Sequence, residues 1–146
     1  MSMDRVRAVL DFYRRRAREY LGRHEYDAEI QDLTPDGVRH GLARLGQGPR
    51  LADPHDEAHL TVFEEWTRTA FGEVAEHRSN PRLHLDNLDL TSYDKDYAPE
   101  ADRATLRRRH LARWADAVDI ALQALDRVPA PVAGAALPAA RAVAAG

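Results

Sequence analysis

The sequence contains no cysteine among its 146 residues. Disulfide bonds, thiol nucleophiles and cysteine-ligated zinc are therefore excluded. Acidic residues outnumber basic ones, 24 to 21, which gives a formal net charge of -3. Because no strongly basic face is implied, we expect no nucleic-acid partner.

Long apolar runs are also missing. No window approaches the ~20 apolar residues of a membrane span, and the charged start MSMDRVRAVL has no apolar signal core. We therefore expect a cytoplasmic protein with no membrane partner.

The common catalytic motifs are absent as well. There is no G-x-S-x-G elbow, no phosphate-binding glycine loop and no dinucleotide fingerprint. A Ser-His-Asp set stays open, but none of the three serines (Ser2, Ser79 and Ser92) has a suggestive setting. The motifs thus assign no reaction to this chain.

What is present predicts an all-α domain. Apolar residues make up 44% and charged residues 31%, an ordinary globular balance for one domain with one modest core. Apolar residues at spacings of three and four predict an array of four to five helices. These cover about 2–21, 34–45, 54–78 and 99–127, with the fifth in the Ala- and Pro-rich tail, 128–146. The two long helices, 54–78 and 99–127, are expected to pack antiparallel.

The apolar stripes of the long helices predict which side chains are buried. The expected inward residues of 54–78 are Ala58, Val62, Phe63, Trp66, Ala70 and Val74. Those of 99–127 are Leu106, His110, Trp114, Val118, Leu122 and Leu125. The tail offers little to bury on its own, so we expect it to pack closely against something larger.

Two histidines have a metal-like spacing. His55 and His59 are four residues apart at the start of a predicted helix, so they share one face and are candidate ligands for one zinc or iron ion. A third ligand has to come from elsewhere, for example from His24, His40 or His77. The alternative is a solvated first helical turn, in which Asp56 and Glu57 are favoured by the helix dipole.

The acidic stretch HLDNLDLTSYDKDYAPEADR, residues 84–103, raises the question of a calcium loop. The mid-loop glycine and the ligand spacing of an EF-hand are absent. A structural connection explains the pattern better, with leucines turned to a core and aspartates in water. Tyr93 and Tyr97 are expected to share one face of a turn, while Asp94 and Asp96 accept hydrogen bonds from backbone amides or arginines.

Two stretches carry a family resemblance. They are YLGRHEYDAEIQDLTPDG at 20–37 and the run from His77 to Ala133. The most specific part is YDKDYAP at 93–99, followed by an Arg-rich helix that contains WADAVD. This order of motifs resembles the actinobacterial branch of the family called domain of unknown function 885, and it covers nearly the whole chain.

The resemblance implies a fragment rather than an enzyme. Members of that family are several hundred residues long and mostly helical, and they are similar to zinc peptidases. Their His-Glu metal motif lies in the C-terminal half, and nothing in residues 1–146 matches it. The resemblance therefore implies a single helical domain that forms the N-terminal portion of a larger fold. Zinc is expected only in the missing C-terminal part.

The same resemblance implies a scaffold role for the acidic stretch. Its loop residues that match the family pattern are Asp89, Tyr93, Asp94, Asp96 and Tyr97. No catalytic residue is carried over to them.

Three functional hypotheses follow. The first is a non-catalytic helical domain that docks on a separate or missing catalytic portion, and forms a homo-oligomer when that portion is absent. The second is a small stand-alone metal-binding bundle or enzyme that uses His55 and His59. The third is a protein–protein interaction module. The chain alone is not expected to be an enzyme.

Overall fold

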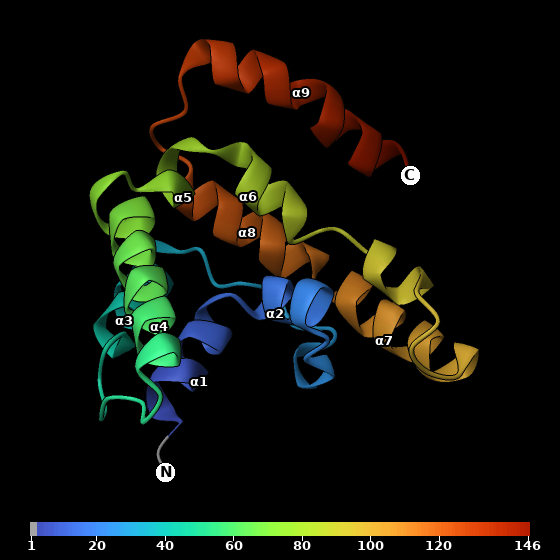
Figure 1. Cartoon of the computed structure of the whole chain (residues 1–146). Coiled ribbons are helices and arrows are strands. Elements are labelled where there is room, and N and C mark those ends of the chain that lie inside the picture. Colours follow the sequence, from blue (N-terminus) through green and yellow to red (C-terminus); the bar gives the residue numbers. More distant parts are fainter. Residues whose placement is uncertain (1–2) are drawn as a thin grey trace.

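The computed structural model describes residues 3–146, and within this range all regular secondary structure is helical (Figure 1). The all-α class is confirmed. The expected number of helices was too low. The longer helices are α1 (Asp4–Phe12), α2 (Arg14–Leu21), α3 (Pro35–Arg44), α4 (Pro54–Thr67), α7 (Glu100–Ala112), α8 (Trp114–Ala124) and α9 (Ala130–Ala145). The shorter elements are η1 (His24–Tyr26), the π-helical η2 (Arg68–Glu73), α5 (Glu76–Ser79), α6 (Pro81–Asp86) and η3 (Thr91–Asp94).

Local capping chemistry sets two helix starts where the sequence predicts them. The Thr34 hydroxyl accepts a hydrogen bond from the amide of Gly37 at 3.0 Å, and proline follows at the first helical position of α3. The Asp53 carboxylate accepts from the amides of His55 and Asp56 before α4. Each cap satisfies amide groups that have no partner within the helix.

The helix count differs because the predicted long helices are interrupted. Tyr13 separates α1 from α2, and Arg113 separates α7 from α8, each with backbone angles outside the ideal helix. After α4 the chain forms the π-helical turn η2 and then enters a left-handed conformation at Ala75. The neighbouring residues Ala70 and Phe71 of this π turn are both buried in the core.

The helices form an open array (Figure 1). Helices α1 and α3 pack together near η2, and α6 packs against α5, α8 and α9. Helix α7 packs against η3 and α8. The expected antiparallel pairing of 54–78 with 99–127 is not among the main helix contacts. No helix among residues 3–146 has the length and hydropathy needed to cross a bilayer.

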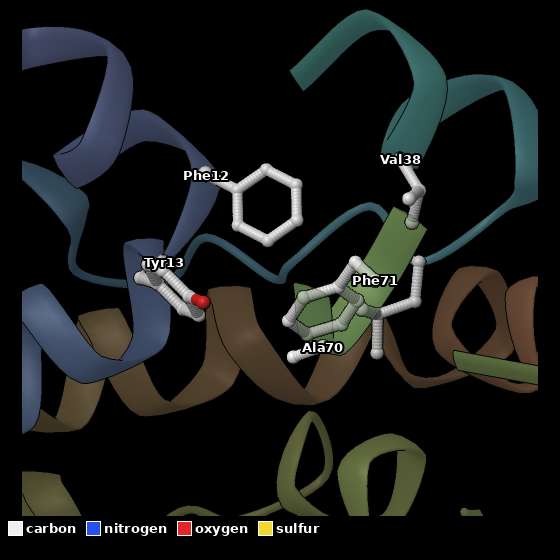
Figure 2. Close-up of a cluster of buried hydrophobic side chains, with 6 residues drawn as sticks. Phe12, Tyr13, Val38, Ala70 and Phe71 are labelled. Atoms are coloured by element: carbon white, nitrogen blue, oxygen red, sulfur yellow. The ribbon is translucent and has the colours of Figure 1, made fainter. Parts of the chain in front are cut away.

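The main core lies where α1, α3 and η2 meet (Figure 2). It is made of Phe12, Tyr13, Leu33, Val38, Ala70 and Phe71. The ring of Phe12 meets those of Tyr13 and Phe71 edge-on, each with centroids 4.9 Å apart. The Tyr13 hydroxyl donates to Thr67 Oγ1, which in turn donates to the Phe63 carbonyl. Burial raises the pKa of Tyr13 to about 12.

Helix α4 corrects the burial prediction. The buried residues of α4 are Glu57, Glu64 and Thr67, whereas Ala58, Val62, Phe63 and Trp66 are exposed. Val74, which follows η2, is 59% exposed as well. The apolar side of α4 therefore faces outward, and the carboxylates of Glu57 and Glu64 face inward.

A buried arginine explains this orientation. The Arg5 guanidinium donates to both carboxylate oxygens of Glu57, at 2.8 Å each, and to Glu64 at 3.0 and 3.2 Å. Glu57 also accepts from the amide of Leu51 at 2.7 Å. Those hydrogen bonds lower the pKa of Glu57, and hydrogen bonds to Glu64 and Glu57 raise the pKa of Arg5. The two carboxylates are seven residues apart, so both share the inward face of α4.

Gly41 gives a test of the packing between α1 and α3. A methyl group at Gly41 would overlap the ring of Phe12. We expect Gly41→Ala to lower the free energy of unfolding by about 1–3 kcal/mol, because overpacking outweighs the gain in helix propensity. Gly134→Ala is the matched control, since nothing lies within 4 Å of its added methyl group. Thermal and urea denaturation would measure both, and an unchanged Gly41→Ala variant would contradict the packing.

Candidate functional site

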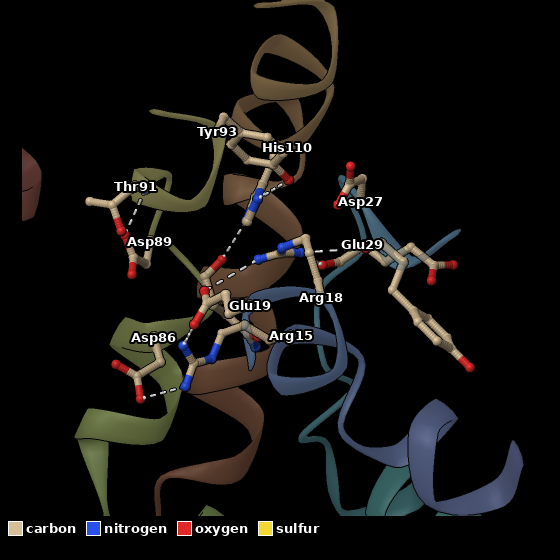
Figure 3. Close-up of polar contacts among 12 residues, drawn as sticks. Arg15, Arg18, Glu19, Asp27, Glu29, Asp86, Asp89, Thr91, Tyr93 and His110 are labelled. Atoms are coloured by element: carbon tan, nitrogen blue, oxygen red, sulfur yellow. Dashed lines mark hydrogen bonds and ion pairs between the residues drawn. The ribbon is translucent and has the colours of Figure 1, made fainter. Parts of the chain in front are cut away.

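The acidic stretch is fixed by a buried histidine. His110 is fully buried, and its Nε2 donates to the backbone carbonyl of Asn87 at 2.7 Å. Its Nδ1 then accepts from the Tyr93 hydroxyl at 2.9 Å, while that hydroxyl accepts from the amide of Ala28 at 2.8 Å. Burial lowers the pKa of His110 and raises that of Tyr93, so both side chains are neutral in this network (Figure 3).

Asn87 extends the network to the segment before α3. Its side-chain oxygen accepts from the amide of Gln31 at 2.9 Å, and its amide nitrogen donates to the Gln31 carbonyl at 2.9 Å. Asn87 is 1% exposed, so its side chain supplies hydrogen-bond partners to backbone groups of Gln31 that water does not reach. Together, Asn87, Tyr93 and His110 join three segments that are distant in sequence.

The predicted loop residues have separate positions. Tyr97 stacks on His24 with ring centroids 3.9 Å apart, whereas Tyr93 meets His110 edge-on. The two tyrosines thus have different partners instead of one shared face.

The aspartates of the loop have local roles. The Asp89 carboxylate accepts a hydrogen bond from the amide of Thr91 at 2.9 Å. Asp96 Oδ1 lies 3.8 Å from Arg103 Nη2, as an ion pair. Asp94 is exposed at the end of η3. These contacts are those of a structural connection.

A small pocket lies beside this network. Its volume is about 110 Å³, and it is lined by Arg18, Glu19, Gly22, His24, Asp27, Ser92, Lys95 and Tyr97. The residues come from α2, η1 and the acidic stretch. Sequence reasoning missed this pocket because it forms only when these segments fold together.

The floor of the pocket holds a buried ion pair. Arg18 is 3% exposed, donates to the carbonyl of Glu29 at 2.8 Å and lies over the Tyr93 ring at 5.6 Å. Its Nη2 is 3.6 Å from Glu19 Oε1 (Figure 3). Burial raises the pKa of Glu19, although Arg15 and Arg18 oppose the shift. Arg15 connects Glu19 to Asp86 of α6.

The histidine pair of α4 is joined by a hydrogen bond. The Nε2 atoms of His55 and His59 are 3.2 Å apart on the exposed side of the helix. Two nitrogens on one tetrahedral zinc ion are about 3.3 Å apart, given Zn–N bonds of ~2.0–2.1 Å. No group of three or more His, Cys, Asp or Glu side chains among residues 3–146 is placed to hold a metal ion. Neither His24, His40 nor His77 therefore completes the pair.

The outward face of α4 forms an apolar surface. Val62 is 65% exposed, Phe63 44% and Trp66 47%, and the guanidinium of Arg16 lies 5.9 Å from the Trp66 ring. We call Val62, Phe63 and Trp66 the α4 outer face. Exposed apolar patches on small domains mark interaction surfaces.

A second apolar hollow lies under α9. Helix α9 has no buried residue and makes its main contacts with α6. Between α9, α6 and α8 lies a hollow of about 500 Å³. Val118 and Leu122, predicted to be buried, line this hollow and are 46% and 77% exposed. Helix α9 thus covers its neighbours only in part.

Comparison with models of protein families, with curated proteins and with solved structures gives no match to this chain. The resemblance to family 885 stays a hypothesis, and the quoted motifs are its support.

Tyr93→Phe tests the buried network. The change removes one donated and one accepted hydrogen bond and leaves the Ala28 amide without its partner. We expect a loss of about 1–3 kcal/mol in the free energy of unfolding. Tyr20→Phe is the control, since Tyr20 is 73% exposed. Urea denaturation would measure both, and equal stability of the two variants would show that the network contributes nothing.

Proposed function

We propose that this chain is a non-catalytic helical docking domain, and that the α4 outer face receives an apolar surface of another polypeptide. The resemblance to family 885 suggests the metal-bearing portion of a peptidase-like protein as that polypeptide. In this proposal, residues 1–146 form one domain, the N-terminal portion of a larger fold.

The observation that carries the proposal is the orientation of α4. Rotating the helix to bury Val62, Phe63 and Trp66 would expose Glu57 and Glu64 and leave buried Arg5 without partners. Breaking a buried ion pair in this way is strongly unfavourable. The outward direction of the apolar residues is therefore maintained by specific contacts, and it suits a face that a partner covers.

The hollow under α9 supports the same function. Val118 and Leu122 of α8 face it, and Leu137 of α9 is 45% exposed. An isolated domain gains stability by closing such a gap, at about 25 cal/mol per Å² of apolar surface. A gap that persists is consistent with a second surface for the larger fold.

The isolated chain should self-associate through the α4 outer face, because a second copy supplies the nearest apolar surface. We expect the mass measured by light scattering to exceed 16.4 kDa and to rise with concentration. Val62→Glu, which places a charge on the α4 outer face, should lower the measured mass towards the 16.4 kDa of one chain without loss of helicity.

Leu21→Glu is the matched control for this experiment. Leu21 lies at the end of α2 and is 65% exposed, as Val62 is, so each variant replaces an equally exposed aliphatic side chain by glutamate. A wild-type chain that remains at 16.4 kDa at all concentrations would contradict the proposal, as would equal effects of the two variants.

A second candidate function is metal binding, and the 3.2 Å separation of the His55 and His59 nitrogens favours it. Zn²⁺ should then bind at one site per chain, and His55→Ala should abolish the heat of binding in calorimetry. His40→Ala is the control, since His40 is an exposed histidine on α3. Zinc binding that survives His55→Ala would refute a role for the pair.

A further inference from the structure

Helix α4 carries an exposed heptad pattern that begins with its two histidines. Four exposed side chains follow one another at spacings of four, three and four residues, which is the d-a-d-a spacing of a coiled-coil seam. They are His55, His59, Val62 and Trp66, which we call the α4 seam. The f positions of the same heptads, on the opposite side of the helix, are Glu57 and Glu64, which bind the buried Arg5. The ion pairs that orient α4 therefore turn the whole seam outward.

The α4 seam is complementary to a second copy of itself in parallel orientation. Two identical parallel helices place each seam residue opposite its own copy, so Val62 meets Val62 and Trp66 meets Trp66. In the flanking g and e positions, Ala58 of one copy then lies near Phe63 of the other, so no like charges meet there. Because α4 has 14 residues, the seam spans only two heptads and buries few apolar side chains. A further link between the copies would add much to its stability.

The histidine end of the seam supplies half of such a link. The Nε2 atoms of His55 and His59 are 3.2 Å apart and share a hydrogen bond, so they converge on one point in solvent. Structural zinc sites have four protein ligands, and no side chain among residues 3–146 is placed to give this pair a third. A two-fold axis along the seam brings two pairs, and thus four nitrogens, together. The carboxylates of Asp53 and Asp56, in the same helical turn, favour a cation there.

We propose, on the basis of the self-association assigned above to the α4 outer face, that two copies of this chain share one Zn²⁺ ion. His55 and His59 of each copy bind it through Nε2. In each pair the histidine that donates the hydrogen bond changes tautomer, with its proton moving from Nε2 to Nδ1, so neutral rings release no net proton. The ion joins the two α4 helices at their N-terminal ends, and the apolar part of the seam packs beside it.

A zinc titration followed by light scattering tests the shared site. The full-length chain is held at a concentration at which it is mostly monomeric with EDTA present. On addition of Zn²⁺, we expect the mass to rise to twice the 16.4 kDa of one chain and to level off at one ion per two chains. Because zinc binds the dimer through twice as many ligands as the monomer, the dimer dissociation constant should fall at least tenfold.

His59→Ala is the variant for this titration. It should abolish the response to zinc and leave the metal-free self-association in place, since His59 lies outside the α4 outer face. His40→Ala, which removes an exposed histidine of α3, is the matched control and should respond as the wild type does.

A cysteine variant tests the parallel orientation, because the sequence has no cysteine of its own. Trp66 is two helical turns from His59, beyond the reach of the zinc ion. In a parallel seam the two copies of residue 66 face each other, so Trp66→Cys should form a disulfide between chains when oxidised with zinc present. Tyr20→Cys is the control, since Tyr20 is an aromatic residue of α2 that is 73% exposed.

The outcomes separate this proposal from the functions proposed above. Zinc that binds once per chain without a rise in mass would overturn the shared site and leave metal binding by the single pair. Self-association that zinc does not strengthen would also overturn it, while the docking function stands. A zinc response that survives His59→Ala, or equal cross-linking of the two cysteine variants, would contradict the shared site or its parallel geometry. A chain that is monomeric without metal at all concentrations and dimerises with zinc would support the shared site and contradict only the docking function.

Discussion

The structure depends on one buried cation. Arg5 of α1 reaches two carboxylates of α4 and, through Glu57, the loop at Leu51. An arginine that is 6% exposed has to be paired, and the fork of its five N–H donors fits two carboxylates better than one. Since both partners lie on one face of α4, the ion pairs decide which way that helix turns.

The orientation of α4 shows where sequence reasoning reaches its limit. A helical stripe of apolar residues is normally the buried one, and Val62, Phe63 and Trp66 form such a stripe. The prediction was wrong because the competing interaction begins at Arg5, 52 residues before Glu57 in the chain. A periodicity within one helix carries no information about a partner at that distance.

Predictions that rest on local chemistry were accurate. The helix starts at Thr34-Pro35 and Asp53-Pro54 follow from a capping oxygen and the fixed φ of proline, both of which act within four residues. The interruptions at Tyr13 and Arg113 were not predicted, because long-range contacts impose them. At Tyr13 the hydroxyl bonds to Thr67 of α4, and at Arg113 the chain has just passed His110, which the Asn87 carbonyl holds.

The features of the candidate site also divide into those that one helix determines and those that depend on contacts between distant segments. The pairing of His55 with His59 is a property of one helix, so the sequence placed the two rings together correctly. The interpretation of the acidic stretch as a connection stays a prediction, and it rests on the absence of the glycine that an EF-hand needs. The small pocket could not be predicted from the sequence, because Arg18 and Ser92 are 74 residues apart and come together only in the fold.

Helix α2 contacts the α4 outer face and also lines the small pocket. On one side, Arg16 lies over the ring of the core residue Tyr13 and over that of Trp66, which belongs to the α4 outer face. On the other side, Arg18 is among the residues that line the small pocket. Ala17 and Arg18 are the only buried residues of this eight-residue helix, so its position depends on a few polar contacts rather than on an extensive apolar face.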